Sequence, residues 1–495
     1  MPPQTPRLLR YGPLSVYVTS REGCVDLQAF IQQTPPSTPV VWCDSARPHA
    51  MTGRWSILGC DPWLTLFARG DRIELRTSAA TRVWREHPLT ALRQVLRRYR
   101  VPASAGPHGR AIGLMGWLSY DLNRWIEALP PPQPAGMPMP EMGWFGMQTA
   151  ILVDHVQRRS WLLRLVDPHA PGPLAHREAL EALEWTIDLL AHRPDDPSTT
   201  RTGQPDAAEE VLGRQPLTVQ PTCTQAEFET MVSRALEFIR AGDIFQANVS
   251  QQFTTLWEGR PLSLYLALRR INPSPFACFL SCEALTAVSC SPERLVRIQD
   301  GRVDTRPIAG TRPRGQSAEE DLLNSLELFV SEKERAEHIM LVDLARNDLG
   351  RIAATGSVGV EELMTLEAYS HVIHIVSNVS GRLRRGVDAV EAIRAVFPGG
   401  TITGCPKVRC MQILRELEPV ARGLYTGSLG YIGFDGTMDL SIAIRTLVLQ
   451  GRRLSFHVGA GIVADSVPER EYHETLAKAG ALLKALGQDH HAAVG

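Results

Sequence analysis

Two pairs of glutamates with the same spacing are the residues of this chain best suited to hold a cation. Glu334 and Glu337 lie in SEKERAEHIMLVDL, and Glu471 and Glu474 lie in SVPEREYHETLAKAG. Residues three apart lie on one face of a helix, so each pair would present two carboxylates together. Facing each other, the pairs would form an all-oxygen site suited to Mg²⁺. Acidic residues are also common in the first turn of exposed helices, and spacing alone favours that simpler interpretation.

Two glycine-rich segments could offer backbone N–H groups to an anion. The first, FPGGTITGCPKVR, runs over residues 397–409, and the second, VGAGIVADS, over residues 458–466. The first lacks the Gly-Lys-Ser/Thr ending of a phosphate loop, and the second lacks the final glycine of a dinucleotide fingerprint. Alone, both segments are typical of tight turns. Lys407 is either an anion contact or a surface charge.

A histidine-bearing segment and an arginine-rich corner are further candidates. His371 and His374 in YSHVIHIVSNVSG are three apart, so in a strand they would face opposite sides and only one would line a given cavity. RPIAGTRPRG, over residues 306–315, is a Gly-Thr corner rich in guanidinium groups. Taken alone, a core or surface histidine and a solvent-exposed turn are the commoner outcomes.

The sequence holds neither a GxSxG elbow nor a cysteine in the Gly-x-Cys-x-Gly setting of a glutaminase nucleophile. We therefore expect that the chain does not produce its own ammonia. Its nine cysteines are odd in number and show no CxxC or Cys/His spacing for zinc. This pattern predicts reduced core thiols rather than a disulfide framework or a structural metal cage.

The composition excludes several classes of protein. Lys+Arg 52 against Asp+Glu 53 gives a net charge of -1, which favours neither nucleic acid nor an anionic membrane as the partner. Hydrophobic residues at 44% and charged residues at 21% are typical of a globular protein. The sequence shows neither a signal peptide nor an apolar run long enough to cross a bilayer. We expect a cytoplasmic protein that binds a small molecule or another protein.

The elements that position these residues fall on either side of a polar, Pro-rich passage. We predict an N-terminal region over residues 8–190, a linker over 191–222 and a catalytic domain over 223–488. A capping box at Thr224 and Glu227 begins one helix. Ser331 is expected to cap a second helix, and Ser466 a last one.

The predicted helices after the linker cover residues 224–242, 332–344, 388–396 and 468–486. Strand patterns occupy residues 64–75, 150–166, 276–280, 285–289, 295–303, 428–434 and 454–458, and 111–122 is an apolar, glycine-containing stretch. Strands interrupted by helices without a regular βαβ alternation favour an α+β fold with largely antiparallel sheets.

An ordered set of segments identifies a family. The segments are SPERL, RPIAGTRPRG, KERAEHIMLVDLARNDLGRIA, YSHVIHIVSNVSG, FPGGTITGCPK, YTGSLGYIGFDGTMDLSIAIRT and GAGIVADSVPEREYHET. Together they closely resemble the chorismate-utilising enzymes, which include anthranilate synthase component I, aminodeoxychorismate synthase component I, isochorismate synthase and salicylate synthase. The resemblance spans roughly residues 224–486, and GRWSILGCDPW and GWLSYDLNRWIEALP match more loosely.

The resemblance implies a fold of two opposed sheets with helices between them and a Mg²⁺-dependent site. Glu337 and Glu474 match the family's direct metal ligands, and Glu334 and Glu471 match outer or water-mediated partners. The metal would hold and neutralise the ring carboxylate of chorismate.

The resemblance also implies roles in substrate binding and catalysis. Arg445 and Tyr425 match residues that grip the enolpyruvyl carboxylate. His374 matches the active-site histidine, and Glu293 is the candidate acid for departure of the ring C4 hydroxyl. The rest of the substrate site is assigned to Gly310, Thr311, Thr401, Lys407, Gly459, Ala460 and Gly461.

Two aminating branches of the family compete. Ala309 stands where many aminodeoxychorismate synthases carry a covalent lysine, and together with YSHVIHIVS it favours anthranilate synthase, a lyase of tryptophan biosynthesis. SPFACFL, FPGG, YTGSLGY and AGDIFQAN favour aminodeoxychorismate synthase, of p-aminobenzoate and folate biosynthesis, and we expect this branch. A separate glutamine amidotransferase subunit is expected to supply ammonia. A chorismate-binding regulatory subunit without catalysis is a third alternative.

Overall fold

The computed structural model describes residues 5–47, 52–134, 136–191, 217–315, 317–368 and 372–488. Within these residues the strands are paired antiparallel throughout and belong to one continuous network. No helix in this part of the chain is both long and apolar enough to cross a membrane.

Two long strands divide this network into two layers. β4 (Trp55–Arg69) pairs along its length with β8 (Met142–Asp154), but the register shifts between Pro62 and Leu64. Asp61 adopts a positive φ of 58° at the same point. The first part of β4 pairs with β3 (Val40–Asp44), whereas the second part pairs with β5 (Arg72–Thr77). A bulge of this kind bends a strand, so β4 and β8 contribute to both layers.

The strands of the first layer pair in the order β1 (Arg7–Tyr11), β2 (Leu14–Glu22), β9 (Arg159–Val166), β8, β4, β3, β12 (Phe276–Ser281), β13 (Thr286–Ser291), β22 (Thr446–Gln450), β23 (Arg453–Ile462) and β11 (Gln246–Leu256). The short strands β10 (Gln220–Pro221) and β19 (Gly404–Cys405) pair with β11.

The second layer contains, again in order of pairing, β6 (Thr81–Arg85), β5, β4, β8, β7 (Gly113–Leu118), β20 (Ser428–Gly433), β21 (Met438–Ile442), β14 (Arg294–Gln299), β15 (Arg302–Thr305) and β18 (Val372–Arg382). β16 (Ile308–Pro313) follows β15 along one edge of β18, and β17 (Gly359–Ala368) pairs with its other edge.

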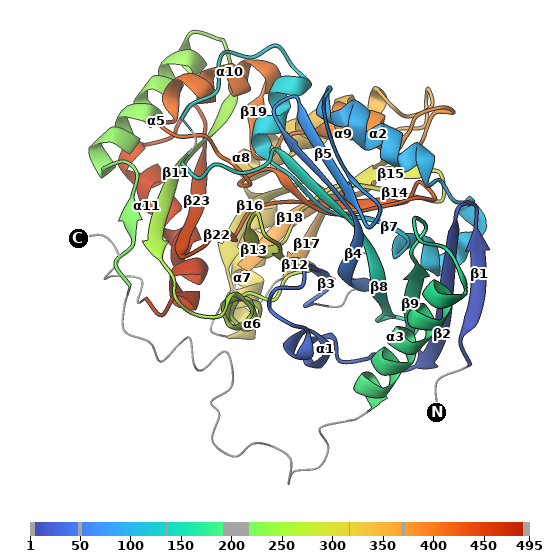
Figure 1. The fold of residues 1–495 in the computed structure, drawn as a ribbon. Helices are drawn as coiled ribbons and strands as arrows, with labels where there is room; N and C mark the ends of the chain where they lie inside the picture. The colour runs from blue at the N-terminus through green and yellow to red at the C-terminus, as the bar shows by residue number, and fades with distance from the viewer. Residues whose placement is uncertain are drawn as a thin grey trace.

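Helices cover both layers (Figure 1). α5 (Gln225–Arg240) packs against α11 (Pro468–Ala485), which lies on β23 and also touches α6 (Pro261–Ile271). α8 (Glu332–Gly350) lies on β16 and β18 beside α9 (Ala389–Val396). The remaining helices are α1 (Leu27–Gln33), α2 (Pro88–Arg98), α3 (Pro173–Ala191), α7 (Ala318–Val330) and α10 (Lys407–Leu417), with 3₁₀ turns at Ala103–Arg110 and Tyr120–Trp125.

Two large cores hold the layers and helices together. Val41 and Leu280 of the first layer share one buried cluster with Trp117 of the second. A second cluster buries Phe456 of β23 against Leu482 of α11. Since burying one large apolar side chain contributes about 1.5–3 kcal/mol, clusters of this size supply the main force that fixes the two layers together.

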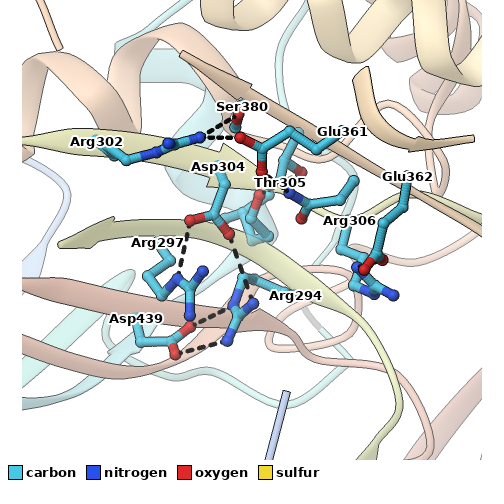
Figure 2. A network of polar contacts seen from close by, with 12 residues as sticks. Arg294, Arg297, Arg302, Asp304, Thr305, Arg306, Glu361, Glu362, Ser380 and Asp439 are labelled. Carbon is cyan, nitrogen blue, oxygen red and sulfur yellow. Dashed lines mark hydrogen bonds and ion pairs between the residues drawn. The ribbon is translucent and has the colours of Figure 1, made fainter. Parts of the chain in front are cut away.

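A chain of ion pairs ties β14, β15, β17, β18 and β21 together on the second layer (Figure 2). Arg294 contacts Asp439 at 2.9 Å and Asp304 at 3.5 Å. Arg302 bonds Glu361 and donates to the Ser380 hydroxyl at 2.9 Å. Arg294 directly follows Glu293, so this network fixes the backbone that carries the candidate acid.

The structure confirms the predicted fold class and most of the predicted elements. The α5 capping box is present, with the Glu227 N–H donating to the Thr224 hydroxyl at 3.3 Å. Ser331 caps α8 as predicted. The Ser466 cap is wrong: the N-cap of α11 is Val467, because the Ser466 hydroxyl instead accepts the Val463 N–H at 3.0 Å.

Three single runs proved to be hairpins. Residues 295–303 form β14 and β15 around Asp300 and Gly301, both at positive φ. Residues 64–75 cover the end of β4 and the start of β5, and residues 150–166 cover the end of β8 and the whole of β9. Most of the predicted linker lies outside the described residues. The domain boundaries stay predictions, and pairing crosses them where β3 meets β12 and β7 meets β20.

Candidate active site

A cavity of about 900 Å³ lies where the far ends of the two layers approach each other. Its walls come from β11 and β23 of the first layer, β16 of the second, and the helices α8 and α11 between them. The sequence-predicted residues that line it are Gly310, Glu334, Glu337, Thr401, Arg445, Gly461, Glu471 and Glu474. The fold therefore brings together residues separated by up to 164 positions in the sequence.

The carboxylates of α8 and α11 face this cavity with neighbours already in contact. Arg312 of β16 forms an ion pair with Glu334 at 3.0 Å. The Gln246 amide N–H donates to Glu337 at 2.7 Å, and Lys478 pairs with Glu474 at 2.7 Å. Burial raises the pKa of Glu337 despite the Gln246 hydrogen bond. Burial likewise raises the pKa of Glu471.

The chemistry of these donors fits Mg²⁺. Among the described residues, no group of three or more His, Cys, Asp or Glu side chains is close enough to form a metal cage. Mg²⁺ does not require one, because it commonly takes one or two carboxylates and completes its shell with water and substrate. Glu337 and Glu474 face one cavity from different helices, and a cation would relieve the desolvation of Glu337. Mg²⁺ binding stays a prediction.

Three glycines form a backbone wall that no other residue would leave open. Gly310 has a φ of +68°, and an added Cβ would lie 2.9 Å from Leu328 and 3.0 Å from Glu334. At Gly461 a Cβ would lie 2.7 Å from the Gln246 amide nitrogen. At Gly459 it would lie 2.6 Å from Asn248 Oδ1 and 2.8 Å from the Tyr425 hydroxyl. The absence of side chains here keeps backbone and acceptor groups accessible.

Arg445 adds a positive charge to a cavity wall that also carries the four carboxylates. It adopts a positive φ of 50°, a conformation that is uncommon for residues other than glycine. Its guanidinium donates to Asn272 Oδ1 at 3.5 Å. Backbone strain at a cavity wall is typical of residues held in place for binding.

Tyr425 lies behind Gly459 and borders a neighbouring cavity of about 270 Å³. Its ring stacks on His457 with centroids 5.1 Å apart and an interplanar angle of 10°. Burial raises the pKa of Tyr425, so the phenol stays neutral. The stack fixes the ring, whose hydroxyl points towards Gly459.

Glu293 is fully buried one hydrogen bond behind the cavity. The Thr401 hydroxyl lines the cavity and donates to Glu293 Oε1 at 2.8 Å. Burial raises the pKa of Glu293 to about 7, although Thr401, the Ile308 backbone and the Arg445 charge oppose this. A carboxyl of this kind is still partly protonated near neutral pH and can donate a proton through Thr401.

His374 packs against the glycine wall from β18. Its Nδ1 lies 3.3 Å from the Gly310 carbonyl oxygen. Burial, together with the nearby Arg445 charge, lowers the pKa of His374 to about 4. The imidazole is therefore neutral at physiological pH.

Three predicted residues, and the alternative histidine His371, are placed differently or lie outside the described residues. Ala460 is fully buried in the core under α5, so only its backbone could meet a substrate. Lys407 is absent from the cavity lining and pairs with Asp348 at 2.6 Å, which gives it a structural role in place of the predicted substrate contact. The Thr311 side chain and the whole of His371 lie outside the described residues, although Thr311 belongs to β16.

The cavity is also lined by polar residues that sequence reasoning missed, among them Gln246, Asn248, Arg312 and Lys478. Gln246 Oε1 and Asn248 Oδ1 are buried without a hydrogen-bond donor among the described residues. Period-2 alternation in QANVSQ places both on one face of β11 and was the available signal. Two such acceptors suit a small molecule with N–H or O–H groups.

The arrangement suits a small molecule with two carboxylates. The cavity wall holds four carboxylates able to bind a cation, which would in turn hold an anionic group. It also holds Arg445, whose planar guanidinium suits a second carboxylate. Neutral His374 lies behind Gly310, and Glu293 lies behind Thr401, where it can deliver a proton to a leaving group.

Comparisons with known proteins agree with this geometry. A model of the chorismate binding enzyme family matches residues 52–484. Anthranilate synthase component 1 from Aquifex aeolicus is 39% identical over 90% of this chain and 88% of its own. Aminodeoxychorismate synthase component 1 from Bacillus subtilis is 38% identical over 93% of this chain and 94% of its own.

A solved structure shows the same fold. Anthranilate synthase component I from Streptococcus pneumoniae superposes with a TM-score of 0.74 at 33% identity, covering 88% of this chain and 93% of that chain.

Proposed function

The chain belongs to the chorismate-binding enzyme family, and from this premise we propose that it is a Mg²⁺-dependent synthase that converts chorismate and ammonia to 4-amino-4-deoxychorismate in the cytoplasm. The observation that carries the proposal is the cavity that gathers the four glutamates, Gly310, Gly461, Thr401 and Arg445. The choice of product rests on the segments SPFACFL, FPGG and YTGSLGY and on the likeness to the B. subtilis enzyme along 93% of this chain.

Two groups of residues at the cavity would hold the two carboxylates of chorismate. Arg445 and the Tyr425 hydroxyl would bind the enolpyruvyl carboxylate. The ring carboxylate would lie towards Glu337 and Glu474, which would hold Mg²⁺ with Glu334 and Glu471 nearby. When bound, the ion would neutralise the ring carboxylate and draw electron density from the ring.

Ala309 lines the cavity, and its methyl group cannot attack a ring carbon. Water or ammonia therefore attacks C2, the ring double bond shifts, and the C4–O bond breaks. The departing hydroxyl takes the hydroxyl proton of Thr401 and leaves as water, while the Thr401 oxygen accepts the proton of Glu293, its hydrogen-bond partner. Ammonia then forms the C4–N bond while the ring double bonds shift back, and the group at C2 takes up a proton and leaves as water or ammonia. Each of the two nucleophiles releases one proton, of which one goes to this leaving group and one restores Glu293. The net change is chorismate plus ammonia to product plus water.

The test is to incubate the purified protein with chorismate, Mg²⁺ and ammonium salt and to identify the product by mass and absorbance. A product that keeps the enolpyruvyl group supports the proposal. Anthranilate with release of pyruvate would refute the product assignment. Chorismate binding without turnover would identify a regulatory subunit instead.

A second candidate, anthranilate synthase component I, is favoured by Ala309 and by the 39% identity to the A. aeolicus enzyme. In that reaction the C2-amino intermediate loses the C2 proton and the enolpyruvyl group departs as pyruvate. The same cavity could hold both reactions, since they share their first step.

We also propose that a glutamine amidotransferase subunit delivers the ammonia. The sequence contains no Gly-x-Cys-x-Gly nucleophile, and the two relatives are named as component 1 of their synthases. Glutamine should replace ammonium only when the amidotransferase encoded in the same genome is added. Turnover of glutamine by the chain alone would contradict this proposal.

A further inference from the structure

The solvent-facing side of α7 is apolar. Its exposed side chains are Leu322 at 60%, Leu323 at 59%, Leu326 at 50%, Phe329 at 43% and Val330 at 64% exposure. On a helix with about 100° between residues, these five side chains fall within an arc of roughly 120°. We call this surface the α7 face. Surface helices normally turn polar residues to the solvent and apolar residues to the core.

The buried side of α7 is the narrower one. Leu328 is fully buried and lies opposite the α7 face, where it packs on Ile373 and Ile375 of β18. Leu328 therefore holds the helix on the sheet, while the larger group of apolar side chains faces the solvent. Contiguous exposed apolar patches on a protein surface typically mark binding sites for other proteins.

The α7 face lies close to the candidate active site. α7 packs on β16, the strand that supplies Ala309, Gly310 and Arg312 to the cavity wall. The Arg312 guanidinium bonds Glu327 of α7 at 3.2 Å and Glu334 of α8 at 3.0 Å. A protein seated on α7 would thus be one side chain away from the cavity.

We propose that the α7 face is the docking site of the glutamine amidotransferase subunit. The inference rests on the proposed function, because only a chain that consumes ammonia but does not produce it from glutamine needs such a partner. Docking beside the cavity keeps the path of ammonia short, and Arg312 links the docked helix to Glu334.

The charge around the α7 face defines the chemistry of the partner. Glu319, Glu320 and Asp321 occupy the first turn of α7. The matching surface would have an apolar centre and a basic rim, since interfaces place complementary charges around an apolar core. A second copy of this chain would present the same α7, which has an acidic first turn and no basic residue in its last turn, so self-association through this face lacks charge complementarity.

The test is the double variant Leu322→Glu with Leu326→Glu. Both side chains are exposed and neither contacts the cavity, so ammonium-dependent turnover should stay within about twofold of the wild type. Glutamine-dependent turnover with the amidotransferase should fall by more than about tenfold, and the complex should weaken equally in a calorimetric titration. The matched control is Leu174→Glu with Val156→Glu, at two exposed apolar positions elsewhere, which should change neither activity.

The outcomes separate the docking site from the proposed function. Loss of glutamine-dependent turnover alone supports docking on α7. Unchanged glutamine-dependent turnover and an unchanged complex overturn it, while ammonium-dependent turnover still upholds the amination. Wild-type dimers that the double variant dissolves would also overturn it, because a second copy would then cover the face. Absence of turnover with ammonium in the wild type refutes the proposed function itself.

Discussion

The charge of Glu293 depends on its burial. Its pKa is raised to about 7 from the ordinary value of 4.5, first by desolvation. Between these two pH values the folded chain binds more protons than the unfolded chain. The contribution of Glu293 to stability is therefore complete below about pH 4.5 and is lost as the pH rises through about 7.

Replacing Glu293 with Gln should change stability and catalysis in opposite directions. Relative to the wild type, the free energy of unfolding of E293Q should rise by about 2–3 kcal/mol between about pH 5 and about pH 8. Its turnover should fall by about 10²-fold or more, because the amide cannot donate the proton. Urea unfolding at both pH values checks the first effect. A difference between E293Q and the wild type that is independent of pH would contradict the assignment.

A substitution at Glu337 tests the proposed metal site at the level of a single residue. Glu337→Gln removes one charged oxygen ligand but keeps the shape and the hydrogen bond from Gln246. We expect the dissociation constant for Mn²⁺, measured by electron paramagnetic resonance as a stand-in for Mg²⁺, to rise by about tenfold or more. Glu332→Gln, in the first turn of the same helix, is the matched control. Equal Mn²⁺ binding by the wild type and E337Q would exclude Glu337 as a ligand.

At the scale of elements, Gly310 of β16 leaves the space that side chains of α7 and α8 need in order to pack on the sheet. Gly310 and Gly301 have nearly the same positive φ, +68° and +72°. An added Cβ at Gly310 would crowd Leu328 of α7 and Glu334 of α8, whereas at Gly301 nothing lies within 4 Å. The two positions therefore separate backbone strain from steric crowding.

We expect Gly301→Ala and Gly310→Ala each to lose about 1–2 kcal/mol of stability through the left-handed conformation. Only G310A should also weaken Mg²⁺ activation and reduce turnover, because Glu334 and α7 must move. Thermal unfolding and turnover as a function of Mg²⁺ concentration measure both effects. Equal turnover of the two variants would show that Gly310 does not position the helices.

Local signals predicted the elements well, and long-range pairing decided what they missed. The capping box at Thr224 and Glu227 and the i,i+3 glutamates needed only neighbours in sequence, and both were placed correctly on helices. The hairpin at Asp300 and Gly301 was overlooked, although an Asp-Gly pair between apolar residues is a turn signal. α7 was also overlooked, although Leu322, Leu326, Phe329 and Val330 follow the helical period. Because these residues face outward, the same period would have placed the core on the wrong side of the helix.

The candidate site shows the same division. Glu334, Glu337, Glu471 and Glu474 were found because the ordered motifs named them, and the cavity now contains all four. Gln246 and Asn248 were missed, since a strand pattern alone does not say which face meets a cavity. Lys407 was assigned to the substrate, but its ion pair with Asp348 joins two segments 59 positions apart. No spacing rule could have shown this.

At the scale of the whole molecule, the N-terminal and C-terminal parts form one structure. β3 pairs with β12, and β7 pairs with β20, so each layer contains strands from both parts. Asp44 at the end of β3 accepts hydrogen bonds from Tyr265 at 2.9 Å and Arg269 at 2.5 Å on α6. The N-terminal part therefore completes the sheets that carry the cavity walls.

A chain cut between residues 191 and 217 should consequently stay assembled. We expect the two fragments, produced at an introduced protease site, to elute together and to keep ammonium-dependent turnover, because both strand junctions and the shared core remain. Asp44→Ala should weaken their association by about 2–3 kcal/mol, since Tyr265 and the partly exposed Arg269 lose their common acceptor. Analytical size exclusion of the cut wild type and the cut variant measures this. Separation of the wild-type fragments under native conditions would show that the covalent connection, and not the continuous sheet, holds the two parts together.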